Sequence, residues 1–387
     1  MIRSQKQHAV LPSATHDEAA RQDFMTGLRV HVMREVSAGN RTIYDSKVRP
    51  RFQHAYGRAP ADRHEVRREM NREPYHQAWG ALLRTTQEMM WESVGSSIER
   101  QLDDLIARNN APKARAGGSL QLDPELEVPR YQTATDIHVM PGSYHSDLCD
   151  GDLTAGAIYD KGLYIYAMGG LGDSNQDIGR GCIAYLKQQF PDLKPQRILD
   201  LGCTVGHSTA PFAAGYPGAE VYGIDVGAAS LRYAHARAES LGASVHFSQQ
   251  NAEDTNFPDG HFDLIVSHVL LHETSGAALP RIIRECRRLL APGGVMTHCD
   301  VPQREGDAFD LAIPDWDTYN NNEPFMGRMR DADLRQIFTD SGFARNRYFD
   351  GYVPNDKLND DKKVTFRGGD GKKGKPWAIY GARANSD

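Results

Sequence analysis

The chain has 387 residues, 40% of them apolar, and a formal net charge of −6. This much apolar material can bury a substantial core, so the composition excludes a chain that is disordered throughout. The acidic balance does not favour nucleic acid as a partner, because its phosphates attract basic proteins.

The sequence also gives an expectation about location. It has no apolar run of the roughly 20 residues that a helix needs to span a bilayer. Its five cysteines are odd in number and never spaced as Cys-x-x-Cys, which is typical of reduced thiols rather than of disulfides or a structural zinc site. We therefore expect a soluble, cytoplasmic protein that binds neither a membrane nor nucleic acid.

Two stripes of apolar residues predict helices near the start of the chain. The first lies in residues 16–36, where Phe24 and the apolar residues four and eight positions later share one helical face. The second runs over residues 74–107, with apolar residues at steps of three and four. We predict a mostly α-helical N-terminal domain over residues 1–110, which either covers a pocket or pairs two subunits in a homodimer.

Residues 111–194 are rich in Gly, Pro, Asp and Tyr. Tyr159 and Tyr164 lie here among several glycines and are candidate substrate contacts. We predict an irregular connecting segment, which either folds over a ligand or serves only as a structural connector.

Short apolar strands alternate with helices over residues 195–387, which we take as the third domain. This alternation indicates a parallel sheet that is covered by helices on both faces. The predicted strands are residues 197–201, 220–224, 244–249, 262–266, 295–299, 345–349 and 378–382.

The stretch Asp-Leu-Gly-Cys-Thr-Val-Gly, residues 200–206, ends the first of these strands. Ligands of open parallel sheets bind beyond the carboxyl ends of the strands, and Gly202 and Gly206 let the backbone approach a ligand closely. A dinucleotide fold would have Gly-x-Gly-x-x-Gly here. Asp200 would repel a pyrophosphate but could receive an ammonium group, directly or through water, so we expect a nucleoside that carries an amino acid.

The next strands also end in polar residues. Asp225, at the end of the second strand, can accept hydrogen bonds from both hydroxyls of a ribose. Asn251 and Ala252 follow the third strand, where an adenine ring would lie, and His268 follows the fourth. Three such strand ends in succession strongly indicate a nucleoside site.

Five segments within residues 195–301 resemble class I S-adenosylmethionine-dependent methyltransferases with a type 11/25-like core: LDLGCTVGHST, VYGIDV, QQNAED, FDLIVSHVLLHE and RRLLAPGGVM. The resemblance implies an α/β fold with a Rossmann-like seven-stranded methyltransferase sheet, its last strand antiparallel. It implies S-adenosylmethionine as cofactor and S-adenosylhomocysteine as product. The cofactor-binding residues that we expect are Asp200, Gly202, Thr204, Gly206, Asp225, Val226, Asn251, Ala252 and His268.

Two positions depart from the pattern of the family. Thr204 stands where many members have glycine, and Asn251 stands where many have aspartate. The amide of Asn251 can both donate and accept, so it can still hold an adenine amino group.

The cofactor of this family supplies an activated methyl group, so the protein must align a nucleophile and exclude water. A hydroxyl acceptor also benefits from a base. His272 is our first candidate, with His268 and Asp300 as the other catalytic candidates. Alternatively, His268 packs against the cofactor and His272 only caps or lines a helix. The His-x-x-x-His spacing also suggests a metal pair, but no third ligand has a suggestive spacing, and we expect no metal.

A segment between the fifth and sixth strands combines flat apolar side chains with amides, as small-molecule pockets do. Some of these side chains are equally suited to anchoring a loop to the core. The candidate substrate contacts are Trp316, Tyr319, Asn321 and Phe325, with Tyr159 and Tyr164 opposite them.

The leading hypothesis is a methyltransferase that acts on a small, aromatic or apolar molecule at oxygen. One alternative is methylation of nitrogen, sulfur or carbon on a similar small molecule. The other is a non-catalytic S-adenosylmethionine-binding protein whose N-terminal helices form an interaction surface.

Overall fold

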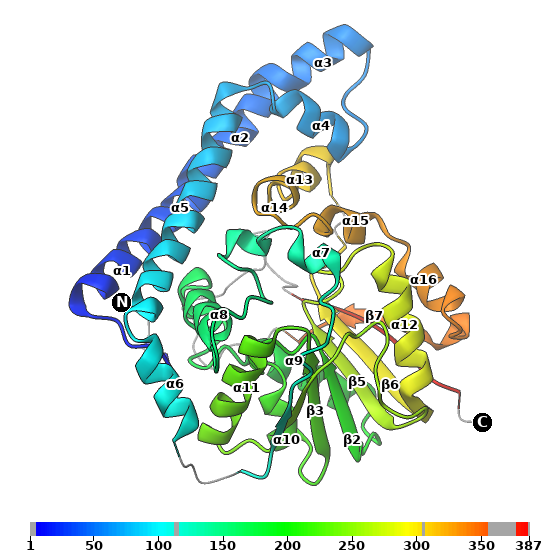
Figure 1. The fold of residues 1–387 in the computed structure, drawn as a ribbon. Helices are drawn as coiled ribbons and strands as arrows, with labels where there is room; N and C mark the ends of the chain where they lie inside the picture. The colour runs from blue at the N-terminus through cyan, green and yellow to red at the C-terminus, as the bar shows by residue number, and fades with distance from the viewer. Residues whose placement is uncertain (1–4, 112–115, 304–305, 355–376, 386–387) are drawn as a thin grey trace.

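A computed structural model describes residues 5–111, 116–303, 306–354 and 377–385 (Figure 1). An eight-stranded sheet lies at the centre, with strand order β1-β4-β3-β2-β5-β6-β8-β7. The strands are β1 (Ser119–Gln121), β2 (Arg197–Leu201), β3 (Glu220–Asp225), β4 (His246–Gln249), β5 (Phe262–His268), β6 (Leu290–Asp300), β7 (Tyr348–Tyr352) and β8 (Ala378–Arg383). Helices cover both faces, and a long helical arm stands along one side (Figure 1).

Every strand pair in this sheet is parallel except those of β8, which runs antiparallel to both β6 and β7. The predicted α/β fold with an antiparallel last strand is therefore confirmed, but the predicted number of seven strands is wrong. The additional strand is β1, which pairs with β4 at the edge of the sheet, Leu120 lying opposite Phe247. It comes from the segment that we expected to be an irregular connector.

Successive residues of β2 show how the two faces of the sheet pack against helices. Ile198 points to one face and Leu199 to the other, and both are fully buried. The first face packs against α9 (Asp177–Gln189), α10 (Ala210–Gly215) and α11 (Ala228–Ser240), and the second against α12 (Ala278–Leu289) and α16 (Leu334–Asp340). Strands that are buried on both faces have nearly continuous apolar sequences, which is why these were predictable.

Helices of residues 16–110 form the arm, in which α1 and α2 lie along α5 (Figure 1). They are α1 (His16–His31), α2 (Ser37–Ile43), α3 (Arg49–Tyr56), α4 (Arg63–Met70), α5 (Pro74–Glu99) and α6 (Leu102–Asn110), with the π-helical turns Val32–Val36 and Tyr44–Val48 on either side of α2. Phe24 was expected on the buried face but is 63% exposed. The buried face of α1 instead carries Gln22, Met25, Thr26 and Arg29. Gln22 donates to the Ser97 hydroxyl of α5 at 3.2 Å, and Met25 joins an apolar cluster with α5 and α8.

The segment expected to be irregular contains two helices of 13 residues each, α8 (Thr154–Tyr166) and α9. The glycines within α8 allow close helix packing. A Cβ at Gly162 would overlap the ring of Trp91 in α5, and one at Gly156 would lie 2.5 Å from Cβ of Tyr233 in α11. Helix α8 therefore joins the arm to the sheet through one shared apolar cluster.

Shorter elements complete the fold: α7 (Arg130–Thr133), α13 (Ala308–Ala312), α14 (Asp315–Asn320), α15 (Met326–Asp331) and the 3-10 turns Ile137–Val139 and Arg345–Arg347. The predicted sixth strand begins late, because its first residues form the second of these turns. Helix α13 packs on α4 at the far end of the arm (Figure 1). No helix among the described residues is both long and apolar enough to cross a membrane.

Candidate active site

A cavity of about 860 Å³ lies between the carboxyl ends of β2, β3 and β5 and the arm helices α1 and α5. A volume of this size is typical of sites for small molecules and cofactors. Two groups of residues face each other across it. We call the lining residues between 202 and 282 the domain wall, and those from α1, α5 and the segments 131–168 and 313–330 the arm wall.

The turn after β2 forms one end of the domain wall. Gly202 has φ +66°, and an added Cβ would lie 2.7 Å from Cδ1 of Leu270, so a side chain does not fit there. Thr204 also adopts a left-handed φ of 47°, a conformation that favours glycine. Gly206 has φ +70° and packs against Phe247 instead of lining the cavity.

Asp225 lines the cavity at the end of β3, next to Val226. Its two carboxylate oxygens accept the backbone N–H groups of Thr204 and Gly227, each at 2.9 Å. Burial raises the pKa of this carboxyl, while the backbone donors act in the opposite direction. Each oxygen keeps a further lone pair for a ligand. Asn251 and Ala252 also lie in this wall, beyond the end of β4.

Asp200 does not line the cavity, so the structure does not place its carboxylate in direct contact with a ligand there. Its carboxylate is buried, accepts the Thr209 hydroxyl at 2.6 Å and lies 3.1 Å from Nδ1 of His268. His268 does line the cavity. Asp200 therefore orients His268 from behind.

His272 lines the cavity, and its Nδ1 lies 2.5 Å from Oδ1 of Asp300. Asp300 is fully buried behind it and accepts the backbone N–H groups of Leu271 at 2.8 Å and Val301 at 2.7 Å. Burial opposes the charged imidazolium, but Asp300 outweighs this and raises the pKa of His272 to about 9. Asp300 is thus placed to act on His272 rather than on a ligand. His268 pairs with a different aspartate, Asp200.

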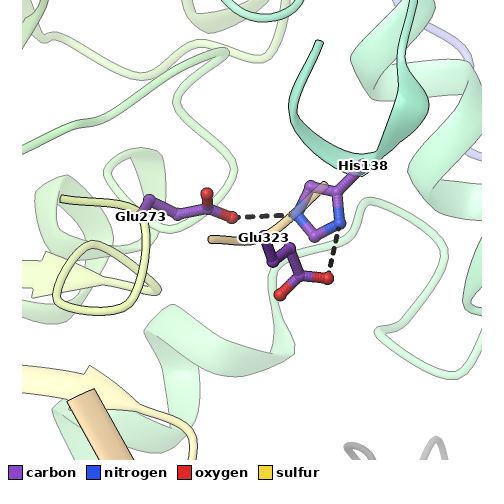
Figure 2. Close-up of side chains that lie close together, drawn as sticks. All are labelled: His138, Glu273 and Glu323. Carbon is purple, nitrogen blue, oxygen red and sulfur yellow. Dashed lines mark hydrogen bonds and ion pairs between the residues drawn. The ribbon is translucent and has the colours of Figure 1, made fainter. Parts of the chain in front are cut away.

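Three side chains that no sequence pattern connects meet across the cavity (Figure 2). His138 lies between two glutamates, with Nε2 at 2.9 Å from Glu273 and Nδ1 at 3.0 Å from Glu323. Burial works against charge on this imidazole, but the two carboxylates hold its pKa well above the usual range. His138 in turn outweighs burial at Glu323 and lowers the pKa of that carboxyl to about 2. We call these three residues the His138 cluster.

Residues 198–294 match the family described as "Methyltransferase domain". The chain is 32% identical over 133 residues to demethylmenaquinone methyltransferase of Thermus thermophilus, covering 34% of this chain and 59% of that protein. It is 32% identical to ubiquinone biosynthesis O-methyltransferase of Cereibacter sphaeroides, covering 30% and 45%, and 26% identical to phosphoethanolamine N-methyltransferase 3 of Arabidopsis thaliana, covering 46% and 33%. The matches therefore span less than two thirds of each relative.

The chain contains a class I methyltransferase domain. Its matched residues include the whole domain wall, whereas the arm wall lies outside them. The resemblance to the family therefore describes one side of the cavity. The other side is formed by segments for which the sequence showed no family pattern.

Of the predicted substrate contacts, the structure places only two in the arm wall. Tyr159 and Trp316 line the cavity, and Trp316 also donates from Nε1 to the Gly80 carbonyl of α5 at 3.1 Å, so it anchors its loop as well. The other four predicted contacts do not line the cavity. Tyr164 is buried, and Tyr319 is 53% exposed with the Arg67 guanidinium over its ring. Asn321 contacts His138, and Phe325 packs edge-on against Tyr131.

The arm wall contains aromatic residues that were not predicted as contacts, among them Tyr131, Tyr144 and Trp91. Trp91 lies within the helix predicted over residues 74–107, but no prediction was made for it; it also belongs to the apolar cluster between the arm and α8. For His138 and Glu323 there was no usable signal, because each is a single polar residue in an irregular stretch. Glu273 adjoins the predicted base, so only that member of the His138 cluster could have been suspected.

Proposed function

We propose that this protein is an S-adenosylmethionine-dependent methyltransferase that methylates a small, aromatic or largely apolar molecule at oxygen. The observation that carries the proposal is one cavity with a nucleoside-type strand-end site and a histidine–aspartate pair in its wall. The matched relatives include an O-methyltransferase and an N-methyltransferase by name, so they do not decide the acceptor atom. His272 is the group that favours oxygen.

The residues of the domain wall fit this cofactor. Gly202 lines the cavity without a side chain, and Asp225 presents buried carboxylate oxygens that can accept hydrogen bonds from ribose hydroxyls. Asn251 and Ala252 would border the adenine, and His268 would lie beside the amino-acid part. When bound, S-adenosylmethionine supplies an activated methyl group, and S-adenosylhomocysteine is the product.

His272 would take the proton of the acceptor hydroxyl. Its Nδ1 faces Asp300, which fixes the neutral tautomer with the proton on Nδ1 and leaves Nε2 as the accepting atom. Such a base contributes about 10²–10⁴-fold to a rate. Asp300 is a positioning residue in this scheme.

The arm would cover the bound molecules. Its helices α1 and α5 contribute Arg29, Trp79, Leu83 and Gln87 to the cavity, and a covered site keeps water away from the reacting groups. This supports the covering role for the N-terminal helices. A homodimer formed through them, and the absence of nucleic-acid partners and metal, stay predictions.

The first experiment is calorimetric titration of the full chain with S-adenosylmethionine and S-adenosylhomocysteine. Asp225→Ala should weaken both by about 10-fold or more, because hydrogen bonds to a charged group contribute about 1.5–3 kcal/mol each. The exposed Asp192→Ala is the matched control and should bind as the wild type does. Absence of binding by folded wild-type protein would overturn the proposal.

Transfer is tested next with labelled cofactor and a panel of phenols, carboxylic acids, amines and thiols. Methylation of a hydroxyl or carboxyl oxygen is the expected result. Cofactor binding with no transfer to any class would favour a non-catalytic binding protein instead.

A further inference from the structure

Two carboxylate oxygens in the His138 cluster have no hydrogen-bond partner among the described residues: Oε2 of Glu273 and Oε2 of Glu323. Both glutamates line the cavity, and their side chains are only 9% and 3% exposed. The other oxygen of each already contacts His138. Buried polar atoms normally have partners, so two free acceptors in a cavity wall indicate that a ligand supplies the donors.

The charges in the cluster do not balance. One imidazolium, His138, lies between two carboxylates, so one negative charge is left over. Nε2 of His272 lies 3.6 Å from Oε1 of Glu273 and 3.9 Å from Oε2 of Glu323, beyond hydrogen-bond distance, and Nδ1 of His272 is paired with Asp300 at 2.5 Å.

The two arginines of the arm wall, Arg29 and Arg330, have hydrogen-bond partners outside the cluster. Arg29 donates to Gln87 at 2.8 Å and stacks over Tyr166, and Arg330 donates to the Pro314 carbonyl at 2.8 Å. Among the described residues, no lysine or arginine forms an ion pair with Glu273 or Glu323, whose charged contacts are with His138 and His272 only.

Aromatic rings surround the same place. Tyr144 lies edge-on to His138, with ring centroids 6.4 Å apart, and Tyr159 lies 5.5 Å from Tyr144. Trp91 donates from Nε1 to the His138 carbonyl at 2.8 Å. All three line the cavity. Free carboxylate oxygens beside aromatic rings are the surroundings that bind an organic ammonium group.

A metal ion fits this place less well. His138, Glu273 and Glu323 do offer a nitrogen and two oxygens within 4.8 Å of one another. However, each ring nitrogen already faces one glutamate (Figure 2), so the imidazole has no lone pair directed at a common centre. Hard divalent cations also prefer several oxygen ligands and water, whereas aromatic side chains border this cluster.

We propose that the methyl acceptor carries a protonated amine, which donates to the free oxygens of Glu273 and Glu323. This inference rests on the proposed function, because it assigns the substrate class of the same cavity. The amine subsite adjoins His272, so the molecule that fits is an arylalkylamine with its hydroxyl within reach of the base. The ammonium group here is a recognition element, since a protonated nitrogen has no lone pair for a methyl group.

The test uses matched probe pairs that differ only in the charged group: benzylamine and benzyl alcohol, tyramine and 4-hydroxyphenylethanol, tryptamine and its alcohol. Each is titrated by calorimetry at pH 7 into the full chain saturated with S-adenosylhomocysteine. We expect at least one amine to bind 10-fold or more tightly than its alcohol. Glu323→Gln and Glu273→Gln, which keep the shape and remove the charge, should each reduce this preference to about two-fold or less.

Glu99→Gln, an exposed position on α5, is the control and should keep the preference. Circular dichroism of each variant confirms folding, and either glutamine variant suffices if the other does not fold. No amine preference in any pair would overturn the inference, and so would a preference that survives both substitutions.

Two further titrations separate other uses of the cluster. Binding of Mn²⁺ alone that Glu323→Gln abolishes would show a metal site and overturn the inference. If Glu323→Gln or Glu273→Gln loses affinity for S-adenosylmethionine but keeps it for S-adenosylhomocysteine, whose sulfur is uncharged, the carboxylates bind the cofactor. That result would also overturn the inference. Failure of the proposed function has a different readout, because the wild type would then bind neither form of the cofactor. The amine titrations are therefore repeated on the chain without cofactor, where the amine preference is measured independently.

Discussion

The two walls of the cavity are held in place by different kinds of contact. In and behind the domain wall, backbone groups fix the functional carboxylates: Asp225 accepts from Thr204 and Gly227, and Asp300 accepts from Leu271. These donors follow strand ends, so their positions are set by the sheet itself.

In the arm wall, side chains fix one another. Arg29 donates to Gln87 at 2.8 Å, the amide of Gln87 donates to Asn321 at 2.5 Å, and Asn321 contacts His138 at 3.1 Å. These residues come from four separate segments. Buried networks of this kind are cooperative, so the arm wall depends on how the arm docks. Under the proposed function, the sheet edge would hold the cofactor and the opposite wall would select the substrate.

The largest effect is expected where the domain wall meets the substrate. His272→Ala should lower the rate of methyl transfer to a hydroxyl by about 10²–10⁴-fold, because the proton acceptor is lost. Its affinity for S-adenosylmethionine should stay within about three-fold of the wild type, since Asp225 is untouched, an effect below 1 kcal/mol. Single-turnover kinetics and calorimetry measure the two quantities separately.

His261→Ala is the matched control for this change, because His261 precedes β5 at the opposite end of the strand from the cavity. It should leave both quantities unchanged. Full activity of His272→Ala would mean that the acceptor needs no base, which favours nitrogen or sulfur as the acceptor atom.

The pH dependence of methyl transfer also tests whether His272 is the base. Because Asp300 raises the pKa of His272 to about 9, the imidazole is charged at neutral pH and accepts a proton only after losing one. The rate should therefore rise with pH and level off above about 9. At pH 7 it should be about 100-fold below the plateau, since each pKa unit corresponds to a factor of ten. Asp300→Asn should move the midpoint of the profile to lower pH, and an unmoved midpoint would show that His272 is not the base.

How much the sequence predicts also differs between the walls. Gly202, Asp225 and Asn251 could be placed in one site because each follows a buried strand, and parallel strands end at the same edge. Asp200 shows the limit of this reasoning. A strand-end position does not say which way a side chain points, and that carboxylate turns to Thr209 and His268 instead of the cavity.

The arm wall was largely beyond prediction. His138 and Glu323 are 185 positions apart and meet only after the arm, the connector and the loop after β6 have docked. The glycines of α8 indicated a loop, because the sequence does not show that Gly162 faces Trp91. Strand β1 was missed since three residues at a sheet edge carry too little pattern.

A substitution where the arm packs against α8 should affect ligand binding by the two walls differently. Gly162→Ala places a Cβ against the Trp91 ring, and overpacking of this kind costs about 1–3 kcal/mol. The free energy of unfolding should fall by about that amount, and acceptor binding should weaken more than cofactor binding. Denaturant unfolding and calorimetry measure both.

Gly95→Ala in α5 is the matched control, because nothing lies within 4 Å of its added Cβ. Alanine is the better helix former by about 1 kcal/mol, so this variant should be as stable as the wild type or more stable. Equal losses of cofactor and acceptor binding in Gly162→Ala would contradict the separation of the walls.

The smallest effect is expected inside the domain wall. Thr204 has a φ of 47°, and a non-glycine residue in this region costs about 1–3 kcal/mol, which glycine avoids at the expense of greater freedom in the unfolded chain. Thr204→Gly should therefore raise the free energy of unfolding by no more than about 1 kcal/mol. It should keep cofactor affinity, because the backbone N–H that Asp225 accepts is retained. A large loss of affinity would show that the threonine side chain contacts the cofactor, and the domain wall would then depend on side chains as the arm wall does.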